Sequence, residues 1–184
     1  MLKELKKCLK NELKENDIFD IVVYGSMVKG KARPGDIDIL VIFTQGTLKE
    51  RLSKLQVIKK KIKFDNVDVK AVLWNELFDP AFFAKTGIFL EGVSLKNLKK
   101  FSLKIGFSAF SLFTYNLKDK LHREKVKFNY VLSGRGSEGI VKKLAGEHLG
   151  PGVIKIPIGF SLEFEDVLTM HKINFKKNNI LVED

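Results

Sequence analysis

The chain has 184 residues, of which 45% are hydrophobic and 15 are phenylalanine, so it can fill a core without covalent cross-links. Its one cysteine excludes an intrachain disulfide, and no apolar run approaches the roughly 18 residues that a membrane-spanning helix needs. The formal net charge of +11 favours polyanionic partners, namely nucleotides or nucleic acid, although solvated surface lysines explain it equally well. We expect a cytoplasmic protein.

The first half of the chain alternates between helical and strand patterns. Leucines spaced three to four residues apart predict an opening helix, and dense apolar runs predict buried strands before Gly25 and after Gly35. In chain order, the expected elements are a helix over residues 2–13, strands over 18–24 and 36–43, a helix over 52–62, a strand over 67–74, a helix over 75–85 and an extended or loop segment over 87–95. This order predicts an α/β (α+β) fold, with a small mixed sheet flanked by helices.

The pattern changes near residue 99, where apolar and polar residues begin to alternate. A domain over residues 1–98 is therefore expected to precede a basic α+β domain over residues 99–184. Residues 117–132 fit a helix or a strand. The other elements expected in the second domain are a half-exposed strand over 101–108, a strand over 152–158, a helix over 161–170 capped by Ser161, and a strand over 173–182.

A glycine-serine pair and an Asp-x-Asp strand stand close together in the first domain. Gly25-Ser26 ends the first expected strand and opens a short helical turn, where free backbone amides let a phosphate approach closely. Asp36-Ile37-Asp38 begins the second strand, and its alternation places both carboxylates on one face. Two such carboxylates can bind divalent cations, which hold nucleotide phosphates and lower the pKa of an attacking hydroxyl.

A purely structural interpretation also fits the bare Asp-x-Asp pattern. Asp36 would cap the turn after Pro34-Gly35, and Asp38 would face solvent from an edge strand. The preceding Gly25-Ser26 disfavours this interpretation, because a capped turn has no need of a phosphate-binding turn beside it.

The passage resembles the minimal nucleotidyltransferases of the polymerase-beta superfamily. The matching positions, within about residues 18–95, are Gly25-Ser26, Gly30, Ala32-Arg33-Pro34 and Asp36-Ile37-Asp38. The resemblance implies that Gly25 and Ser26 contact the phosphates of an NTP, with ATP expected, and that Asp36 and Asp38 bind two Mg²⁺ or Mn²⁺ ions. Gly35 departs from the Ser or Asp that family members usually carry at that position.

The family also uses a third carboxylate on a neighbouring strand, for which Asp68 and Asp65 are candidates. Asp68 is preferred, because it lies within the alternation of the 67–74 strand and Asp65 lies just before it. The resemblance gives this carboxylate metal ligation and a part in deprotonating the acceptor hydroxyl. A surface aspartate at a strand start is the alternative. Lys29, Lys31 and Arg33 are expected to pair with the triphosphate, although solvated side chains fit the same positions.

Weaker signals lie in the second half. Residues 134–139 have the glycine spacing of a dinucleotide-binding loop but lack the acidic residue about twenty positions on, so a turn before a short helix is expected. Arg135 within that turn could clamp a backbone phosphate. The three histidines lack metal-site spacing. Aromatic residues with interleaved lysines fit either stacking on single-stranded bases or a core, and they are Phe107, Phe110, Phe113, Tyr115, Phe128 and Tyr130.

Three functions remain open from the sequence. The first is an enzyme that transfers a nucleoside monophosphate from an NTP to an acceptor hydroxyl, with the basic second domain positioning an acceptor such as RNA. The second is the same chemistry directed at a protein, as in antitoxins that adenylylate a partner toxin. The third is a noncatalytic nucleic-acid-binding module that retains the fold. Intact Asp36 and Asp38 favour an enzyme, and the basic charge favours a nucleic-acid acceptor.

Overall fold

The computed structural model of the chain describes residues 1–28 and 36–183. These residues form two compact units, Met1–Phe107 and Ser108–Glu183, each with its own four-stranded sheet. The division falls after Phe107, whereas the sequence pattern predicts it after residue 98. Residues 99–107 therefore pack with the first unit.

The first unit is built on a mixed sheet with the strand order β3-β2-β1-β4. Strand β1 pairs antiparallel with β2 and β4, and β2 pairs parallel with β3. In chain order the elements of this unit are α1 (Leu2–Cys8), η1 (Glu12–Lys14), β1 (Ile18–Tyr24), η2 (Gly25–Met27), β2 (Ile37–Phe43), α2 (Leu48–Lys61), β3 (Val67–Leu73), η3 (Asn75–Phe78), α3 (Lys85–Glu91), β4 (Val93–Ser94) and α4 (Phe101–Lys104).

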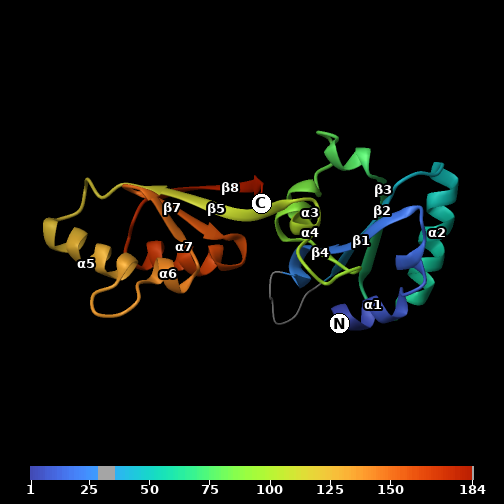
Figure 1. Cartoon of the computed structure of the whole chain (residues 1–184), viewed down its shortest axis with the longest axis horizontal. Helices are drawn as coiled ribbons and strands as arrows, with labels where there is room; N and C mark the ends of the chain where they lie inside the picture. The colour runs from blue at the N-terminus through green and yellow to red at the C-terminus, as the bar shows by residue number, and fades with distance from the viewer. Residues whose placement is uncertain (29–35, 184) are drawn as a thin grey trace. The chain divides into compact units, whose positions relative to one another are not determined.

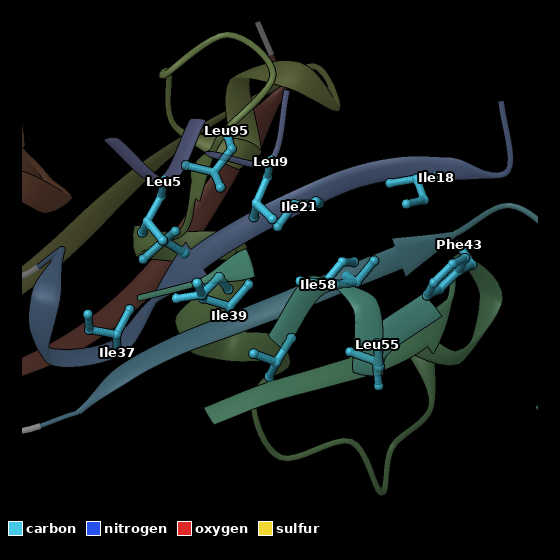
Figure 2. Close-up of a cluster of buried hydrophobic side chains, with 14 residues drawn as sticks. Leu5, Leu9, Ile18, Ile21, Ile37, Ile39, Phe43, Leu55, Ile58 and Leu95 are labelled. Atoms are coloured by element: carbon cyan, nitrogen blue, oxygen red, sulfur yellow. The ribbon is translucent and has the colours of Figure 1, made fainter. Parts of the chain in front are cut away.

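The central strands β1 and β2 bury apolar side chains on both faces of this sheet. On one face, Ile39 packs in a cluster with Leu5 of α1 and Ile58 of α2 (Figure 2). On the other face, Leu40 belongs to a cluster that includes Phe101 of α4. The sheet is thus a middle layer between helices (Figure 1), and burial on both faces explains why both strands read as continuous apolar runs.

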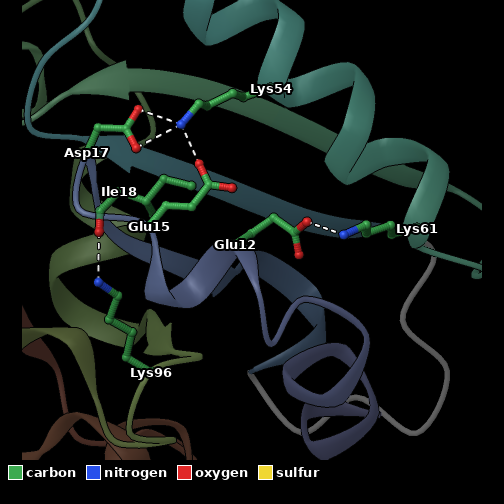
Figure 3. A network of polar contacts seen from close by, with 7 residues as sticks. All are labelled: Glu12, Glu15, Asp17, Ile18, Lys54, Lys61 and Lys96. Carbon is green, nitrogen blue, oxygen red and sulfur yellow. Dashed lines mark hydrogen bonds and ion pairs between the residues drawn. The ribbon is translucent and has the colours of Figure 1, made fainter.

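A set of lysine contacts fastens the segment around the start of β1 to α2 and to the segment after β4 (Figure 3). Lys54 Nζ lies 2.7 Å from Oδ2 of Asp17, and Lys61 pairs with the nearly buried carboxylate of Glu12. Lys96 Nζ donates to the first carbonyl oxygen of β1 at 2.7 Å. The Lys54 and Lys61 contacts hold α2 against the segment before β1, and the Lys96 contact joins the segment after β4 to the start of β1.

The segment after residue 98 folds back onto β1, so the half-exposed strand predicted over 101–108 is wrong. Phe101–Lys104 is the helix α4, and Phe101 is completely buried. Lys104 Nζ lies 2.6 Å from Oδ2 of Asp20, whose side chain is also completely buried. A buried carboxylate requires a cationic or hydrogen-bonding partner, and this requirement overrides the alternating pattern that suggested a strand.

Other boundaries in the first unit also differ from the predicted ones. The opening helix ends at Cys8, and the segment over 87–95, expected to be extended or a loop, is helical to Glu91 and forms the short strand β4 after it. Only the single turn η3 forms within the helix predicted over 75–85. Helix α2 begins earlier than predicted, because Thr47 and Glu50 form a capping box whose two members hydrogen-bond to each other's backbone.

The second unit has a sheet with the strand order β6-β7-β5-β8, and β7 pairs antiparallel with both β5 and β6. Its helices lie along one face of the sheet (Figure 1). Its elements are β5 (Phe107–Tyr115), α5 (His122–Ser133), α6 (Ile140–Lys143), β6 (Glu147–Gly150), β7 (Val153–Pro157), η4 (Ile158–Phe160), α7 (Ser161–Met170) and β8 (Phe175–Glu183). The ambiguous 117–132 segment is therefore helical over most of its length.

Ser161 does not cap α7 as predicted. It is the first residue of the helix, Phe160 is the N-cap, and the Ser161 hydroxyl is buried in a hydrogen bond of 2.8 Å with the Ser111 hydroxyl of β5. Across the described ranges, no helix combines the length and the apolar character required to cross a bilayer.

Candidate active site

The predicted metal-binding carboxylates lie at one edge of the first sheet. Asp38 is the second residue of β2 and Asp68 the second residue of β3, and the parallel register places them directly opposite each other. Across the other ladder of β2, Asp38 is opposite Tyr24, the last residue of β1. Asp36 lies just before β2 and is exposed. Because neighbouring strands are about 4.8 Å apart, three strand ends bring these side chains together.

The glycine-serine turn contacts the Asp-x-Asp strand directly. Gly25 has a φ of +76°, and a β-carbon on it would collide with Oδ2 of Asp38. Both facts restrict this position to glycine. The Ser26 hydroxyl donates to the backbone carbonyl of Asp36 at 3.2 Å. A phosphate held at the turn would therefore lie beside the carboxylates.

Negative charge is concentrated at this edge. Burial, and after it the charge of Asp68, raises the pKa of Asp38 above the ordinary aspartate value, and Lys70 opposes the rise. Burial likewise raises the pKa of the Tyr24 hydroxyl, with Lys70 opposing the rise and Asp38 and Asp68 adding to it. A bound cation would relieve this accumulation of like charges.

Lys70 and Tyr24 belong to this edge, although no sequence motif singles them out. Lys70 Nζ lies 3.0 Å from Oδ2 of Asp68, and the two side chains are 54% and 48% exposed. The hydrogen bond to Asp68 raises the pKa of Lys70. The available signal in the sequence is position: Lys70 is two residues after Asp68 and so shares its strand face, and Tyr24 directly precedes Gly25.

The side chains have the chemistry that a hard divalent cation prefers, since Mg²⁺ takes carboxylate oxygens as ligands. Within residues 1–28 and 36–183, no group of three or more His, Cys, Asp or Glu side chains is arranged to hold a metal ion. Oδ2 of Asp68 is engaged by Lys70. Asp38 and the adjacent Asp36 are thus the carboxylates available at the glycine-serine turn.

The remaining predicted residues of the site divide into two groups. Asp65 is exposed and lies in the turn before β3, outside the ladder in which Asp68 faces Asp38. Lys29, Lys31 and Arg33, together with Gly30, fall outside the described residues.

The glycine-rich segment of the second half follows helix α5 and precedes the short helix α6. The turn before a short helix is thereby confirmed, and the strand required by a dinucleotide-binding loop is not in front of it. The Arg135 guanidinium lies 4.9 Å from the centre of the Tyr130 ring. Of the aromatic residues considered for base stacking, Phe113 and Phe128 are in the core of the second unit, and Tyr115 is partly buried.

A comparison with protein families finds that residues 2–105 match the family described as the nucleotidyltransferase domain. The match is longer than the span of about 18–95 suggested by the motifs, and it ends close to the boundary of the first unit at Phe107. It therefore includes α4, the helix that closes the first unit over Asp20. No curated protein matches the chain.

Proposed function

The chain belongs to the nucleotidyltransferase domain family, and from that premise we propose that it transfers a nucleoside monophosphate from ATP to a hydroxyl of an RNA with the help of two Mg²⁺ or Mn²⁺ ions. Membership makes the chain a transferase enzyme with nucleotide chemistry. The nucleotide, the ions and the acceptor are the proposed part.

One observation carries the proposal: the glycine-serine turn packs against Asp38, and Asp38 faces Asp68 on the next strand. Phosphate-binding backbone and carboxylates are the two parts that NMP transfer requires side by side. A surface aspartate pair would need neither the left-handed Gly25 nor its close approach to the Asp38 carboxylate.

In this proposal, the turn at Gly25 and Ser26 binds the triphosphate, and Lys29 and Arg33 pair with its charges. Asp36 and Asp38 would hold the ions, and Asp68 would be a further ligand once its ion pair with Lys70 is broken. Bound divalent ions would stabilise the charge on the phosphates. Asp68 accepts the proton of the acceptor hydroxyl, whose oxygen forms a bond to the α-phosphorus. The bond from that phosphorus to the bridging oxygen breaks, and pyrophosphate leaves with the electron pair.

The transfer assay that tests the proposal incubates the full chain with each labelled NTP, Mg²⁺ or Mn²⁺, and a pool of small RNAs or a cell lysate. We expect label on RNA with the wild type and a loss of at least a hundredfold with Asp36→Asn/Asp38→Asn. Asp68→Asn should also lose transfer, whereas Asp65→Asn, the matched control, should keep it.

Other outcomes would replace the proposal with its competitors. Label on a single protein would identify an antitoxin-like protein adenylyltransferase. The absence of both transfer and metal-dependent NTP binding would leave a noncatalytic nucleic-acid-binding module. Equal transfer by wild type and the double variant would show that the carboxylates are not the catalytic groups.

A further inference from the structure

Three hollows lie near the end of β5 and the start of β8 in the second unit, and α5 lines two of them. The largest, about 510 Å³, is lined by Tyr115, Asn116 and Asn129 among others. The second, about 420 Å³, shares Tyr115 and Asn116 and adds Asn174. The third, about 280 Å³, includes Phe128. The first two hollows share Tyr115 and Asn116, and the Tyr115 ring meets the Phe128 ring of the third hollow edge-on at 5.7 Å.

Side-chain amides are concentrated in the first two hollows. Asn129 and Asn174 are exposed, and neither side chain has a hydrogen-bond partner in the part of the chain that the structure describes. The Asn116 Oδ1 atom accepts from the Lys118 N–H at 3.2 Å, which leaves the Asn116 amino group for a ligand. Amides pair well with the edges of unpaired bases, because both have a donor beside an acceptor.

Aromatic rings border the same hollows. Tyr115 and Phe175 both line the second hollow, together with the amides of Asn116 and Asn174. A ring beside an amide provides the two contacts that an unstacked base can make, namely stacking and hydrogen bonding to its edge.

Lysines line the second and third hollows. Lys176 lines the second hollow, and Lys120, Lys127 and Lys172 line the third. Within residues 1–28 and 36–183, none of these four forms an ion pair with an acidic side chain. Glu124 is the acidic residue among them, and its carboxylate accepts from the Leu121 N–H at 2.9 Å. The surplus of positive charge favours a phosphate backbone.

The wall of the first hollow is fixed by a backbone contact. Gly152 has a φ of +72°, and a β-carbon on it would collide with the carbonyl oxygen of Tyr115. The Tyr115 N–H donates to the Gly152 carbonyl at 2.8 Å. The backbone at Tyr115 is therefore held in place before a ligand arrives, which lowers the entropy lost on binding.

We propose that the surface of the second unit around these hollows binds single-stranded nucleic acid, with lysines on the phosphates, Tyr115 and Phe175 against the bases, and asparagines on the base edges. The inference rests on the proposed function, because it identifies the surface that holds the acceptor. The residues of this surface are separate from the carboxylates of the candidate active site.

The test is equilibrium binding of fluorescent 12-nucleotide RNA, the same sequence as DNA, and its RNA duplex to the full chain, without NTP or metal. We expect both single strands to bind more tightly than the duplex. Lys172→Gln/Lys176→Gln should weaken binding about tenfold and reduce the slope of log K against log salt by about 1.4, since each phosphate that is no longer neutralised by a lysine lowers the slope by about 0.7. Asn116→Ala/Asn174→Ala should also weaken binding at least threefold without changing that slope.

The matched control is Lys59→Gln/Lys60→Gln on α2, which removes the same charge from an exposed surface of the first unit. Equal weakening by the two lysine pairs, tighter binding of the duplex, or no binding of any strand would overturn the proposal. Asp36→Asn/Asp38→Asn should bind RNA normally. If the wild type binds single-stranded RNA but transfers no nucleotide in any assay, the proposed function is contradicted, whereas the assignment of this surface to nucleic-acid binding stands.

Discussion

Lys70 Nζ lies 3.0 Å from Oδ2 of Asp68, and Asp68 lies directly opposite Asp38 in the parallel ladder. A cation of the protein itself thus neutralises part of the negative charge where divalent ions are proposed to bind. An ion pair between half-exposed side chains is worth about 1 kcal/mol or less, so a metal ion can displace it.

Replacing Lys70 with glutamine should therefore strengthen divalent cation binding. We expect Lys70→Gln to lower the Kd for Mn²⁺ by about two- to fivefold, measured by calorimetry without nucleotide. In the wild type, the ion must displace the Lys70–Asp68 ion pair, which is worth up to about 1 kcal/mol, and the variant has no such pair. Lys63→Gln, at another exposed lysine of the same unit, is the control and should leave the Kd unchanged. Weaker Mn²⁺ binding by Lys70→Gln would contradict the placement of the ions beside Asp68.

Adding one methyl group at Gly25 should abolish transfer without unfolding the protein. The new β-carbon would push the Asp38 carboxylate out of position, so we expect Gly25→Ala to lose at least a hundredfold in kcat/KM for NMP transfer. The left-handed backbone adds a stability cost of about 1 kcal/mol.

Gly106→Ala separates the two effects of that substitution. Gly106 also has a positive φ, +83°, but a β-carbon there meets no atom within 4 Å. The Gly106→Ala variant should show a loss of stability similar to that of Gly25→Ala and should retain transfer activity. Comparable activity losses in the two variants would mean that strain, and not the contact with Asp38, is responsible.

Removing the Asp20 carboxylate should destabilise the first unit strongly. Asp20 accepts from the Ser94 hydroxyl at 2.6 Å and from Lys104 Nζ at 2.6 Å. Asp20→Ala leaves the ammonium without its charged partner, and we expect a loss of about 3–5 kcal/mol in the free energy of unfolding, measured by urea denaturation. Asp20→Ala/Lys104→Met should recover part of it. A double variant less stable than Asp20→Ala would show that the lysine contributes through other contacts.

The Arg51–Glu76 pair should make stability depend on pH. Burial acts to raise the pKa of Glu76, but hydrogen bonds from the Leu73 N–H, at 2.6 Å, and from Arg51 outweigh it and lower the pKa below 4.5. The pKa of Glu76 is lower in the folded state than in the unfolded state. The stabilisation by its carboxylate is therefore fully present at a pH above the unfolded-state pKa, and it is lost as the pH falls through the folded-state pKa.

Glu76→Gln is therefore expected to cost about 1 kcal/mol at pH 7, discounted for the 42% exposure of Glu76. The difference from wild type should shrink as the pH falls below 4.5, in thermal unfolding followed across pH 2.5–7. Glu163→Gln, at an exposed position on α7, should show no such dependence. A difference that stays constant across this range would mean that the charge of Glu76 plays no part.

The strands that carry the candidate site residues could be predicted from the sequence, because the relevant patterns are local or periodic. The strands over 18–24 and 36–43 are continuous apolar runs, and the alternation around Asp68 places it on a strand whose register faces Asp38. The contact between Gly25 and Asp38 is consistent with the motif. The position of Lys70 two residues after Asp68 places it on the same strand face, whereas the sequence could not reveal that Tyr24 lies opposite Asp38, because that depends on the pairing of β1 with β2.

By itself, the sequence determined the family, the order of strands and helices around the carboxylates, and the absence of an intrachain disulfide. Only the tertiary structure decided where the first unit ends, because the alternation after residue 100 is that of a strand and α4 forms where Phe101 and Lys104 reach the core of β1. It also decided that the amides and lysines of the second unit gather around the three hollows, since residues from β5, α5 and the start of β8 become neighbours only when the sheet assembles. The spacing of apolar residues indicates which side of one segment faces solvent and which faces the core. A buried charge or a shared hollow depends instead on residues far away in the chain.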